Sequence, residues 1–197
     1  MAAESYPFVS EGEYLARERL ALDKSEYING QIYAMAGAST RHVVISTNVT
    51  VSIGAGLRGK SCQPFNSDMR VRVNQTGLYT YPDLTIACPP LEFDDEQEDT
   101  LLNPTAIIEV LSPSTERYDR GEKFAHFRNV ASLRDYVLIA QDQMRIEHFA
   151  RQSDGSWLLR VAEAPEESVS FTSADCRLIV AEVYERVDFA DMKNMPE

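Results

Sequence analysis

The sequence predicts a single α/β (α+β) domain in which a mixed central β-sheet is flanked by helices and extended by β-hairpins. Three observations predict this class. Short β-prone runs outnumber helical segments; Asn29-Gly30 stands between two such runs; and a helical segment separates the apolar runs at 105–112 and 134–141. We expect residues 1–197 to form one domain, because the chain suits one core and shows no repeat or low-complexity linker.

The N-terminal part is expected to contain a helix, a hairpin and a second helix. Ser10 and Glu13 fit a capping box before a short helix. The run SEYINGQIYAM then predicts a hairpin at 25–35. Ser39 or Thr40 suits the cap of a helix that reaches about residue 57, because apolar residues recur there at helical spacing.

The rest of the chain alternates strands with one further helix. We expect strands at 67–74, 81–88 and 105–112, and a helix from about 120 to 130 that a capping box of Asp119 and Glu122 begins. Strands at 134–141 and 144–151 form a hairpin, followed by two short strands and a last segment that suits either a strand or a helix. The crossover through the helix places the strands at 105–112 and 134–141 in parallel.

The chain is acidic, with a formal net charge of −12. This charge argues against a protein whose main task is to grip nucleic acid through a basic surface, but it leaves room for an enzyme with a local basic groove. Much of the negative charge lies in EFDDEQED, residues 92–99, which we interpret as a solvated loop.

The three cysteines, Cys62, Cys88 and Cys176, are far apart and odd in number. They fit neither a disulfide framework nor a metal site, so we expect free thiols in a reducing cytoplasm. The N-terminus lacks the pattern of a secretory signal, and no apolar run approaches the length of a membrane span. The sequence therefore predicts a cytoplasmic protein without membrane contact.

Two carboxylates lie inside apolar runs. Glu109 is expected to project from its strand with Ile107 and Leu111, and Asp83 lies just inside a neighbouring strand, after Pro82. Two such carboxylates repel each other unless a cation lies between them, and their oxygens suit Mg²⁺ or Mn²⁺.

A lysine completes the candidate site. Lys123 follows Glu109 by 14 residues and sits in the first turns of the expected helix, at the edge of its core-facing side. A metal ion and a lysine together suit hydrolytic phosphodiester cleavage. From spacing alone, plainer interpretations stay open: Asp83 caps a turn, Glu109 belongs to a structural ion pair, and Lys123 is solvated.

The segments YPDLTIA, IIEVLSPST and DRGEKFAHFR resemble the motifs of a family of putative restriction endonucleases, a branch of the PD-(D/E)XK nuclease superfamily. The resemblance covers most of the chain and implies a restriction endonuclease-like core and a Mg²⁺- or Mn²⁺-dependent endonuclease acting on DNA. It implies catalytic Asp83, Glu109 and Lys123, with Asp83, Glu109 and the backbone carbonyl of Val110 as metal ligands. The superfamily's usual lysine position holds Leu111 here, and Lys123 matches a lysine displaced to the following helix.

His42 lies on the apolar side of its expected helix, where a lone histidine suits a satisfied core position. The resemblance also includes His42, which opens a second interpretation as a residue that lines the site and contacts phosphate or nucleophilic water. Glu26 suits a structural role or a second metal role. We expect a twofold homodimer, with the late hairpins near Phe149 and Trp157 as interface, because enzymes that cut both strands commonly present two sites. A different class of function stays open: a catalytically silent nuclease-fold module that binds a protein partner or nucleic acid, which Leu111 and the acidic charge favour.

Overall fold

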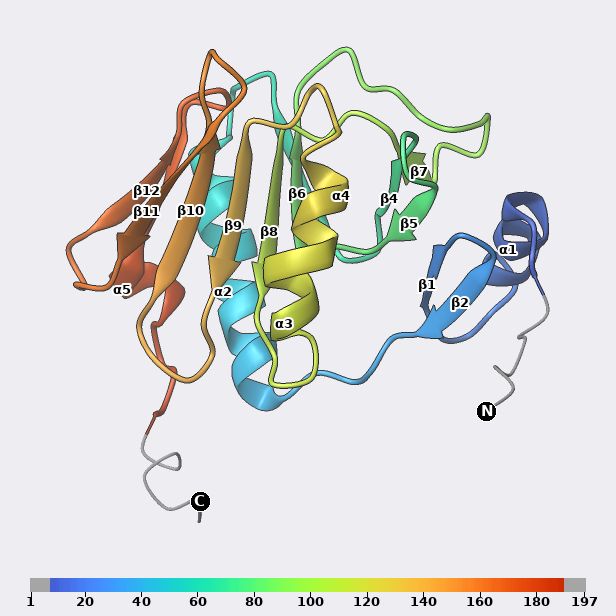
Figure 1. The fold of residues 1–197 in the computed structure, drawn as a ribbon. Helices are drawn as coiled ribbons and strands as arrows, with labels where there is room; N and C mark the ends of the chain where they lie inside the picture. The colour runs from blue at the N-terminus through green and yellow to red at the C-terminus, as the bar shows by residue number, and fades with distance from the viewer. Residues whose placement is uncertain (1–7, 190–197) are drawn as a thin grey trace.

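The computed structural model describes residues 8–189, which form three β-sheets and a small number of helices (Figure 1). The helical elements are α1 (Glu11–Glu18), α2 (Thr40–Gly56), α3 (Glu116–Tyr118), the π-helical turn η1 (Asp119–Lys123), α4 (Phe124–Phe127) and α5 (Val180–Val183). The strands are β1 (Ser25–Ile28), β2 (Gln31–Ala34), β3 (Gln63–Asn66), β4 (Arg70–Val73), β5 (Leu78–Thr80), β6 (Leu84–Ala87), β7 (Thr100–Leu101), β8 (Ala106–Val110), β9 (Asp135–Ile139), β10 (Ile146–Arg151), β11 (Trp157–Ala162), β12 (Ser168–Phe171) and β13 (Cys176–Ile179).

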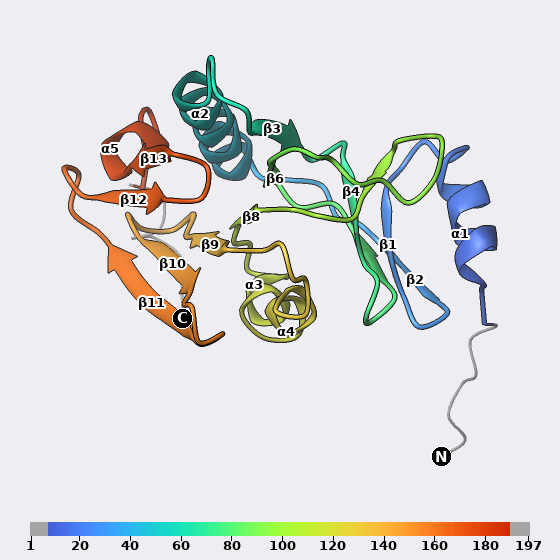
Figure 2. The same cartoon turned by 90° about the horizontal axis from the view of Figure 1, so that it is seen from above.

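The core is a six-stranded sheet of order β11-β10-β9-β8-β6-β3. Only β8 and β9 run parallel, and the other neighbours are antiparallel, so the predicted mixed sheet and the predicted parallel pair are confirmed. Helix α2 covers one face, and the segment α3-η1-α4 covers the other (Figures 1 and 2). The β12–β13 hairpin and α5 pack on the α2 side.

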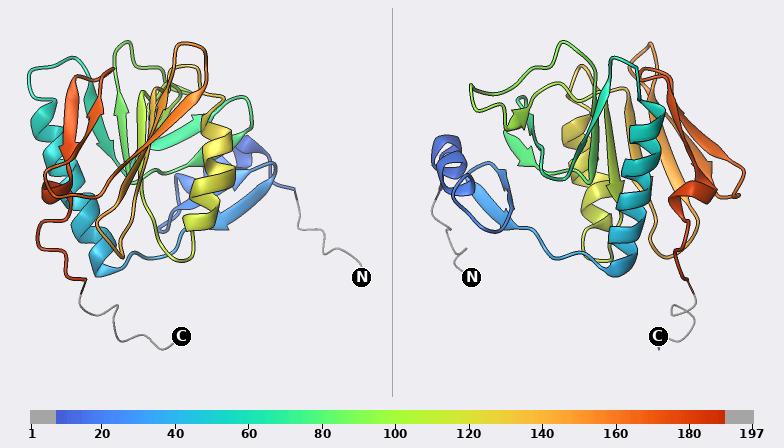
Figure 3. Two further views of the ribbon diagram at one scale, coloured as in Figure 1. Left: turned by 60° about the vertical axis from the view of Figure 1, so that its left-hand side comes forward. Right: turned by 180° about the vertical axis from the view of Figure 1, so that it is seen from behind.

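A second sheet, of order β2-β1-β5-β4-β7, lies beside the core and carries α1 (Figure 3). The predicted hairpin at its edge is confirmed: β1 and β2 pair antiparallel across Asn29 and Gly30, whose φ angles of 49° and 85° suit a tight hairpin turn. On one face of β1, Tyr27 packs with Tyr14 and Tyr79.

Strand β8 separates two hydrophobic clusters. Ala106, Ile108 and Val110 pack with α2, whereas Ile107 and Leu111 pack with α3-η1-α4 and with residues of the second sheet. The predicted alternation is therefore confirmed, and it directs Glu109 toward the helical segment and the second sheet.

The sequence missed several local features. Strands β3, β5 and β7 were not predicted, and the last segment, open between strand and helix, is strand β13 followed by the short helix α5. The Asp119 capping box is wrong, because the helical segment already begins at Glu116. Asp119 therefore lies inside the helix, where its side chain is buried.

The acidic loop at 92–99 is only partly solvated. Asp95 and Asp99 each lie 2.7 Å from Arg19 of the segment after α1, and Asp99 also lies 2.9 Å from the buried Arg70 of β4. Hydrogen bonding from Arg19 holds the pKa of Asp99 well below its usual range. Ion pairs thus hold the loop on the second sheet. The run of acidic residues had predicted a solvated loop instead.

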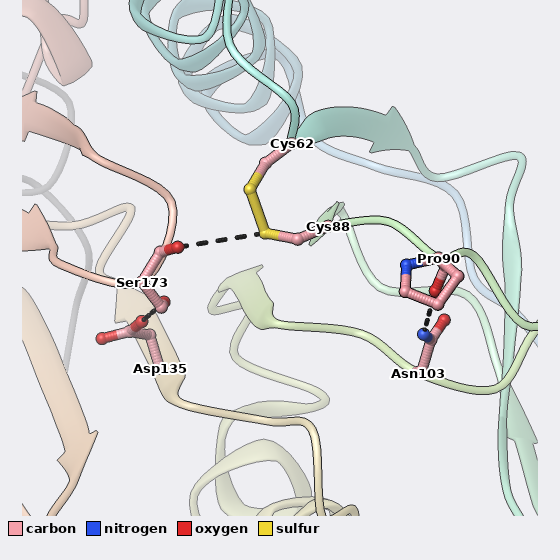
Figure 4. Close-up of a disulfide and its surroundings, with 6 residues drawn as sticks. All are labelled: Cys62, Cys88, Pro90, Asn103, Asp135 and Ser173. Atoms are coloured by element: carbon pink, nitrogen blue, oxygen red, sulfur yellow. Dashed lines mark hydrogen bonds between the residues drawn. A yellow bond between two sulfur atoms is a disulfide. The ribbon is translucent and has the colours of Figure 1, made fainter.

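The prediction of three free thiols is wrong for two of them, because Cys62 and Cys88 form a disulfide (Figure 4). Cys62 directly precedes β3 and Cys88 directly follows β6, and these strands pair Gln63 with Ala87. Antiparallel pairing therefore brings together two cysteines that are 26 residues apart in sequence. The thiol argument for a cytoplasmic location no longer holds. None of the helices among residues 8–189 has the length and apolar character that crossing a membrane requires.

The disulfide should contribute measurably to stability. Closing a loop of 26 residues restricts the unfolded chain, so Cys62→Ser is expected to lower the free energy of unfolding by about 3 kcal/mol. Urea denaturation without reductant measures this difference. The matched control is Cys176→Ser, which removes the free thiol and should stay within about 1 kcal/mol of the wild type. Equal losses in the two variants would contradict the assignment.

Candidate active site

The candidate site lies where β8 meets the helical segment and the second sheet. Glu109 is 4% exposed, and its Oε1 atom lies 2.9 Å from Nζ of Lys123. A buried carboxylate is costly unless it is paired. The ion pair with Lys123 therefore accounts for an acidic residue in an otherwise apolar strand.

Lys123 joins carboxylates from three parts of the fold. Its Nζ lies 2.9 Å from Glu109 of β8, 3.1 Å from Glu26 of β1 and 3.7 Å from Asp119 of η1. Lys123 is 4% exposed, so the alternative interpretation of a solvated lysine is wrong. The π-helical turn holds Asp119 and Lys123, and such turns are frequent at functional sites.

The charges around Lys123 shift its pKa and that of its neighbours. Burial lowers the pKa of Lys123, but Glu109, Glu26 and Asp119 outweigh this effect and raise the pKa well above its usual value. Burial also raises the pKa of Glu109 well above the ordinary range, with the nearby Asp119 and Asp83 adding to the shift and Lys123 opposing it. The lysine therefore stays protonated, while Glu109 holds a proton more readily than an exposed glutamate.

Asp83 and His42 form a second part of the site. Asp83 directly precedes β6, and the β6–β8 register, continued by one residue, places it opposite Glu109. Its Oδ2 atom accepts a hydrogen bond of 2.7 Å from the backbone amide of Val110 and lies 3.2 Å from Nε2 of His42. Hydrogen bonding to Asp83 and to the backbone of Val110 raises the pKa of His42, and burial only partly opposes this.

The predicted ligand set fits a divalent cation in its chemistry. Asp83, Glu109 and the carbonyl of Val110 supply hard oxygen ligands. Hydrogen bonding to Asp83 and to the backbone of Val110 raises the pKa of His42, so the oxygens at this position favour a positively charged neighbour. Glu109 Oε1 is buried without a well-formed hydrogen bond, although it lies beside Lys123. No group of three or more His, Cys, Asp or Glu side chains able to hold a metal occurs within residues 8–189, but the predicted set needs only two such side chains.

The site opens into a cleft of about 1280 Å³ between the two sheets, which α2 also lines. The sequence suggested a local basic groove, but the described lining residues include no arginine and only two lysines, against six aspartates and glutamates. Lys123 is buried, and Lys24 is paired with Asp68. Arg120, which precedes Lys123, pairs with Glu116 and Glu147 and is not among the lining residues.

The structure thus brings together all the side chains that the sequence singled out. Asp83, Glu109, Lys123, His42 and Glu26 line one cleft. Leu111, at the superfamily's usual lysine position, is 4% exposed in the apolar core. Lys123, Glu109, Glu26 and Asp119 form a charge cluster. Sequence reasoning missed Asp119 as a member of this charge cluster, because it assigned the residue to a helix cap. The spacing of Asp119 and Lys123, four residues apart in a helix, was the signal that could have found it.

Comparison with known proteins finds relatives along most of the chain. The family model described as Uma2, putative restriction endonuclease, matches residues 12–174. Two uncharacterized proteins of Synechocystis sp. are similar: one is 38% identical over 154 residues, which is 78% of this chain and 80% of the relative, and the other is 32% identical over 172 residues, 87% and 97% of the two chains.

A solved structure extends this likeness to the fold. The crystal structure of a putative nuclease belonging to DUF820, from Anabaena variabilis, matches with a TM-score of 0.71 and 20% identity, over 89% of this chain and 97% of that chain. The predicted fold class, a restriction endonuclease-like mixed α+β core, is confirmed.

The charge cluster predicts unequal effects for its two central members. Lys123→Met should lower the free energy of unfolding by about 3–5 kcal/mol, because it leaves buried carboxylates without their cation. Glu109→Gln should cost at most about 1 kcal/mol, because Lys123 keeps Glu26 and Asp119 as partners. Urea denaturation gives both values.

Lys60→Met is the matched control for the lysine, since Lys60 pairs at 3.0 Å with the exposed Asp175 and its loss should cost less than about 1 kcal/mol. If Lys123→Met were no more destabilising than Lys60→Met, the central role of the buried ammonium would be refuted.

Proposed function

The chain belongs to the Uma2 family of putative restriction endonucleases, and on that premise we propose that it is a Mg²⁺- or Mn²⁺-dependent endonuclease that hydrolyses phosphodiester bonds in DNA. One observation carries the proposal: Asp83, Glu109 and Lys123 converge at one end of β6 and β8, inside a cleft. Hydrolysis adds water to phosphorus, breaks the bond to one ester oxygen and delivers a proton to that oxygen.

Asp83, Glu109 and the Val110 carbonyl would hold the metal ion. When bound, such an ion polarises a phosphate oxygen and lowers the pKa of a coordinated water. These ligands are fixed before any substrate arrives, since the Val110 amide orients Asp83 and Lys123 orients Glu109. Preorganisation of this kind reduces the rearrangement that the reaction requires.

Two nitrogen-bearing side chains, Lys123 and His42, line the same cleft. Lys123 keeps its ammonium protonated among three carboxylates, and in the proposed reaction it would stabilise negative charge that develops on a phosphate. Hydrogen bonding to Asp83 raises the pKa of His42, and the imidazole positions the Asp83 carboxylate through Nε2. Glu26 of β1 and Asp119 of η1 hold Lys123 in place.

A silent nuclease-fold module is the second candidate, and two observations favour it. Lys123 is already engaged by three carboxylates, and the cleft lining carries few cations with which to hold DNA. Under this alternative the chain keeps the fold and binds a partner or nucleic acid without cleaving it.

A homodimer would use the free edge of the core sheet. Strand β11 ends that sheet, and Leu158, Leu159 and Val161 are 43%, 46% and 39% exposed. Phe149 and Trp157, named from sequence as interface residues, are instead half-buried against Phe124. Exposed apolar edge strands readily pair with another chain.

The dimer proposal is tested by changing the edge alone. Leu159→Lys should shift the protein to monomer in sedimentation-velocity runs, because a charge on each copy opposes edge-to-edge pairing. Leu20→Lys, at a residue that is 87% exposed away from this sheet, is the matched control and should sediment like the wild type. A wild type that stays at 22.2 kDa at all concentrations would rule out the dimer.

The endonuclease proposal is tested with Asp83→Asn, which keeps an oxygen for the Val110 amide but removes the charge. With Mn²⁺, cleavage of plasmid DNA should fall by at least about a hundredfold, as loss of a group that stabilises the transition state would produce. Divalent ions should raise the melting temperature of the wild type and raise that of Asp83→Asn less.

Asp23→Asn, an exposed residue of the same cleft, is the matched control and should leave both cleavage and the thermal shift unchanged. A wild type that cuts no DNA with Mg²⁺ or Mn²⁺ would favour the silent module. Equal thermal shifts in wild type and Asp83→Asn would refute shared metal ligation.

A further inference from the structure

The walls of the cleft away from the carboxylates are neutral and partly apolar. Helix α2 contributes one continuous face to the cleft: Val43, Ser46, Thr47, Thr50 and Val51. Val43 and Val51 are 50% and 66% exposed, and the opposite hairpin adds Tyr33 and Met35, which are 54% and 38% exposed. Exposed apolar groups gathered in one cleft and rimmed by polar residues mark a binding surface.

The hydroxyl groups on the α2 wall are acceptors. Ser46 and Thr47 donate to the backbone carbonyl of Val43, and Thr50 donates to that of Ser46. Their protons are therefore engaged within the helix, while their oxygens remain able to accept hydrogen bonds. A phosphate oxygen needs donors, so this wall suits the N–H edges and flat faces of nucleobases better than a phosphate backbone.

Tyr33 is held close to the charge cluster by strand pairing. It lies directly opposite Glu26 in the β1–β2 register, and cross-strand partners share one face of a sheet. Glu26 in turn lies 3.1 Å from Lys123. An exposed aromatic ring thus stands on the same side of the hairpin as the candidate catalytic residues, and it offers a surface on which a base can stack.

The charge of the cleft also distinguishes between forms of DNA. A duplex carries one negative charge per roughly 1.7 Å of its axis, whereas a single strand carries one per roughly 3.4 Å. The described cleft lining has six carboxylates and two lysines, both of which are already paired. Such a lining repels the denser charge of a duplex more strongly, and it offers base contacts that only unpaired bases can reach.

We propose that the cleft selects single-stranded DNA, with an unpaired base stacked on Tyr33 and neighbouring bases against the neutral face of α2. This inference rests on the proposed nuclease function for its choice of DNA and adds the strandedness of the substrate. Tyr33 is a specificity residue in this scheme, and it lies across the hairpin from Glu26, which contacts Lys123.

The experiment measures binding by fluorescence anisotropy in the presence of a chelator, so that no cleavage occurs. The probes are a labelled DNA strand of about 15 nucleotides and the blunt duplex of the same sequence, a length that suits single-strand sites. The strand should bind at least tenfold more tightly than the duplex. Raising salt from about 50 to 200 mM should weaken binding of the strand by only about threefold per phosphate contact.

Tyr33→Ala should weaken binding of the strand by at least about fivefold, because one base loses its stacking partner, and Tyr33→Trp should retain it. The matched control is Ile32→Ala. Ile32 directly precedes Tyr33 in β2, is 38% exposed and pairs with Tyr27, so it lies on the opposite face of the hairpin. This variant should stay within about twofold of the wild type, since no base contact is lost.

The outcomes separate this inference from the proposed function. Equal or tighter binding of the duplex, absence of strand binding, or equal effects of Tyr33→Ala and Ile32→Ala would overturn it, even if the wild type cuts plasmid DNA. Tyr33-dependent strand binding without any cleavage in Mg²⁺ or Mn²⁺ would support it while contradicting the nuclease proposal.

Discussion

The ammonium of Lys123 is the interaction on which the rest of this structure depends. It lies within 3.7 Å of carboxylates from β1, β8 and η1, so a single buried cation connects the second sheet, the central strand and the helical segment. Three carboxylates gathered in an apolar setting repel one another without it. The cation therefore makes it possible for Glu109 to occupy a strand that is otherwise part of the hydrophobic core.

The ion pairs of Lys123 affect both the stability of the fold and the geometry of the candidate site. A buried ion pair contributes little net stability compared with an apolar core, but breaking one partner is costly. The cluster is thus a poor way to stabilise a fold and a good way to hold charged groups in a fixed geometry. The π-helical turn at Asp119–Lys123 serves the same end, because it places two residues of one helix beside the carboxylate of β8.

The acidic residues of the chain lie in two different settings in the structure. Around the loop at 92–99, carboxylates pair with Arg19 and Arg70 and hold the loop on the second sheet. In the cleft, by contrast, carboxylates exceed cations among the described lining residues. In the proposed nuclease, a divalent cation would offset this excess of negative charge. In the proposed complex with single-stranded DNA, the neutral face of α2 and the ring of Tyr33 would contact the bases.

The sequence by itself determined the alternation of β8, the hairpin at Asn29-Gly30 and the parallel pairing of β8 with β9. It also determined the candidate residues Asp83, Glu109 and Lys123. Strand periodicity, turn chemistry and motif spacing were sufficient for these predictions, because they are local properties of the sequence. Only the tertiary structure decided the rest. The disulfide between Cys62 and Cys88 depends on the pairing of β3 with β6, and the contacts of Glu26 and Asp119 with Lys123 depend on how two sheets and a helix pack. Contacts between residues distant in sequence carry no periodic signal, so the acidic lining of the cleft became visible only when the elements were assembled.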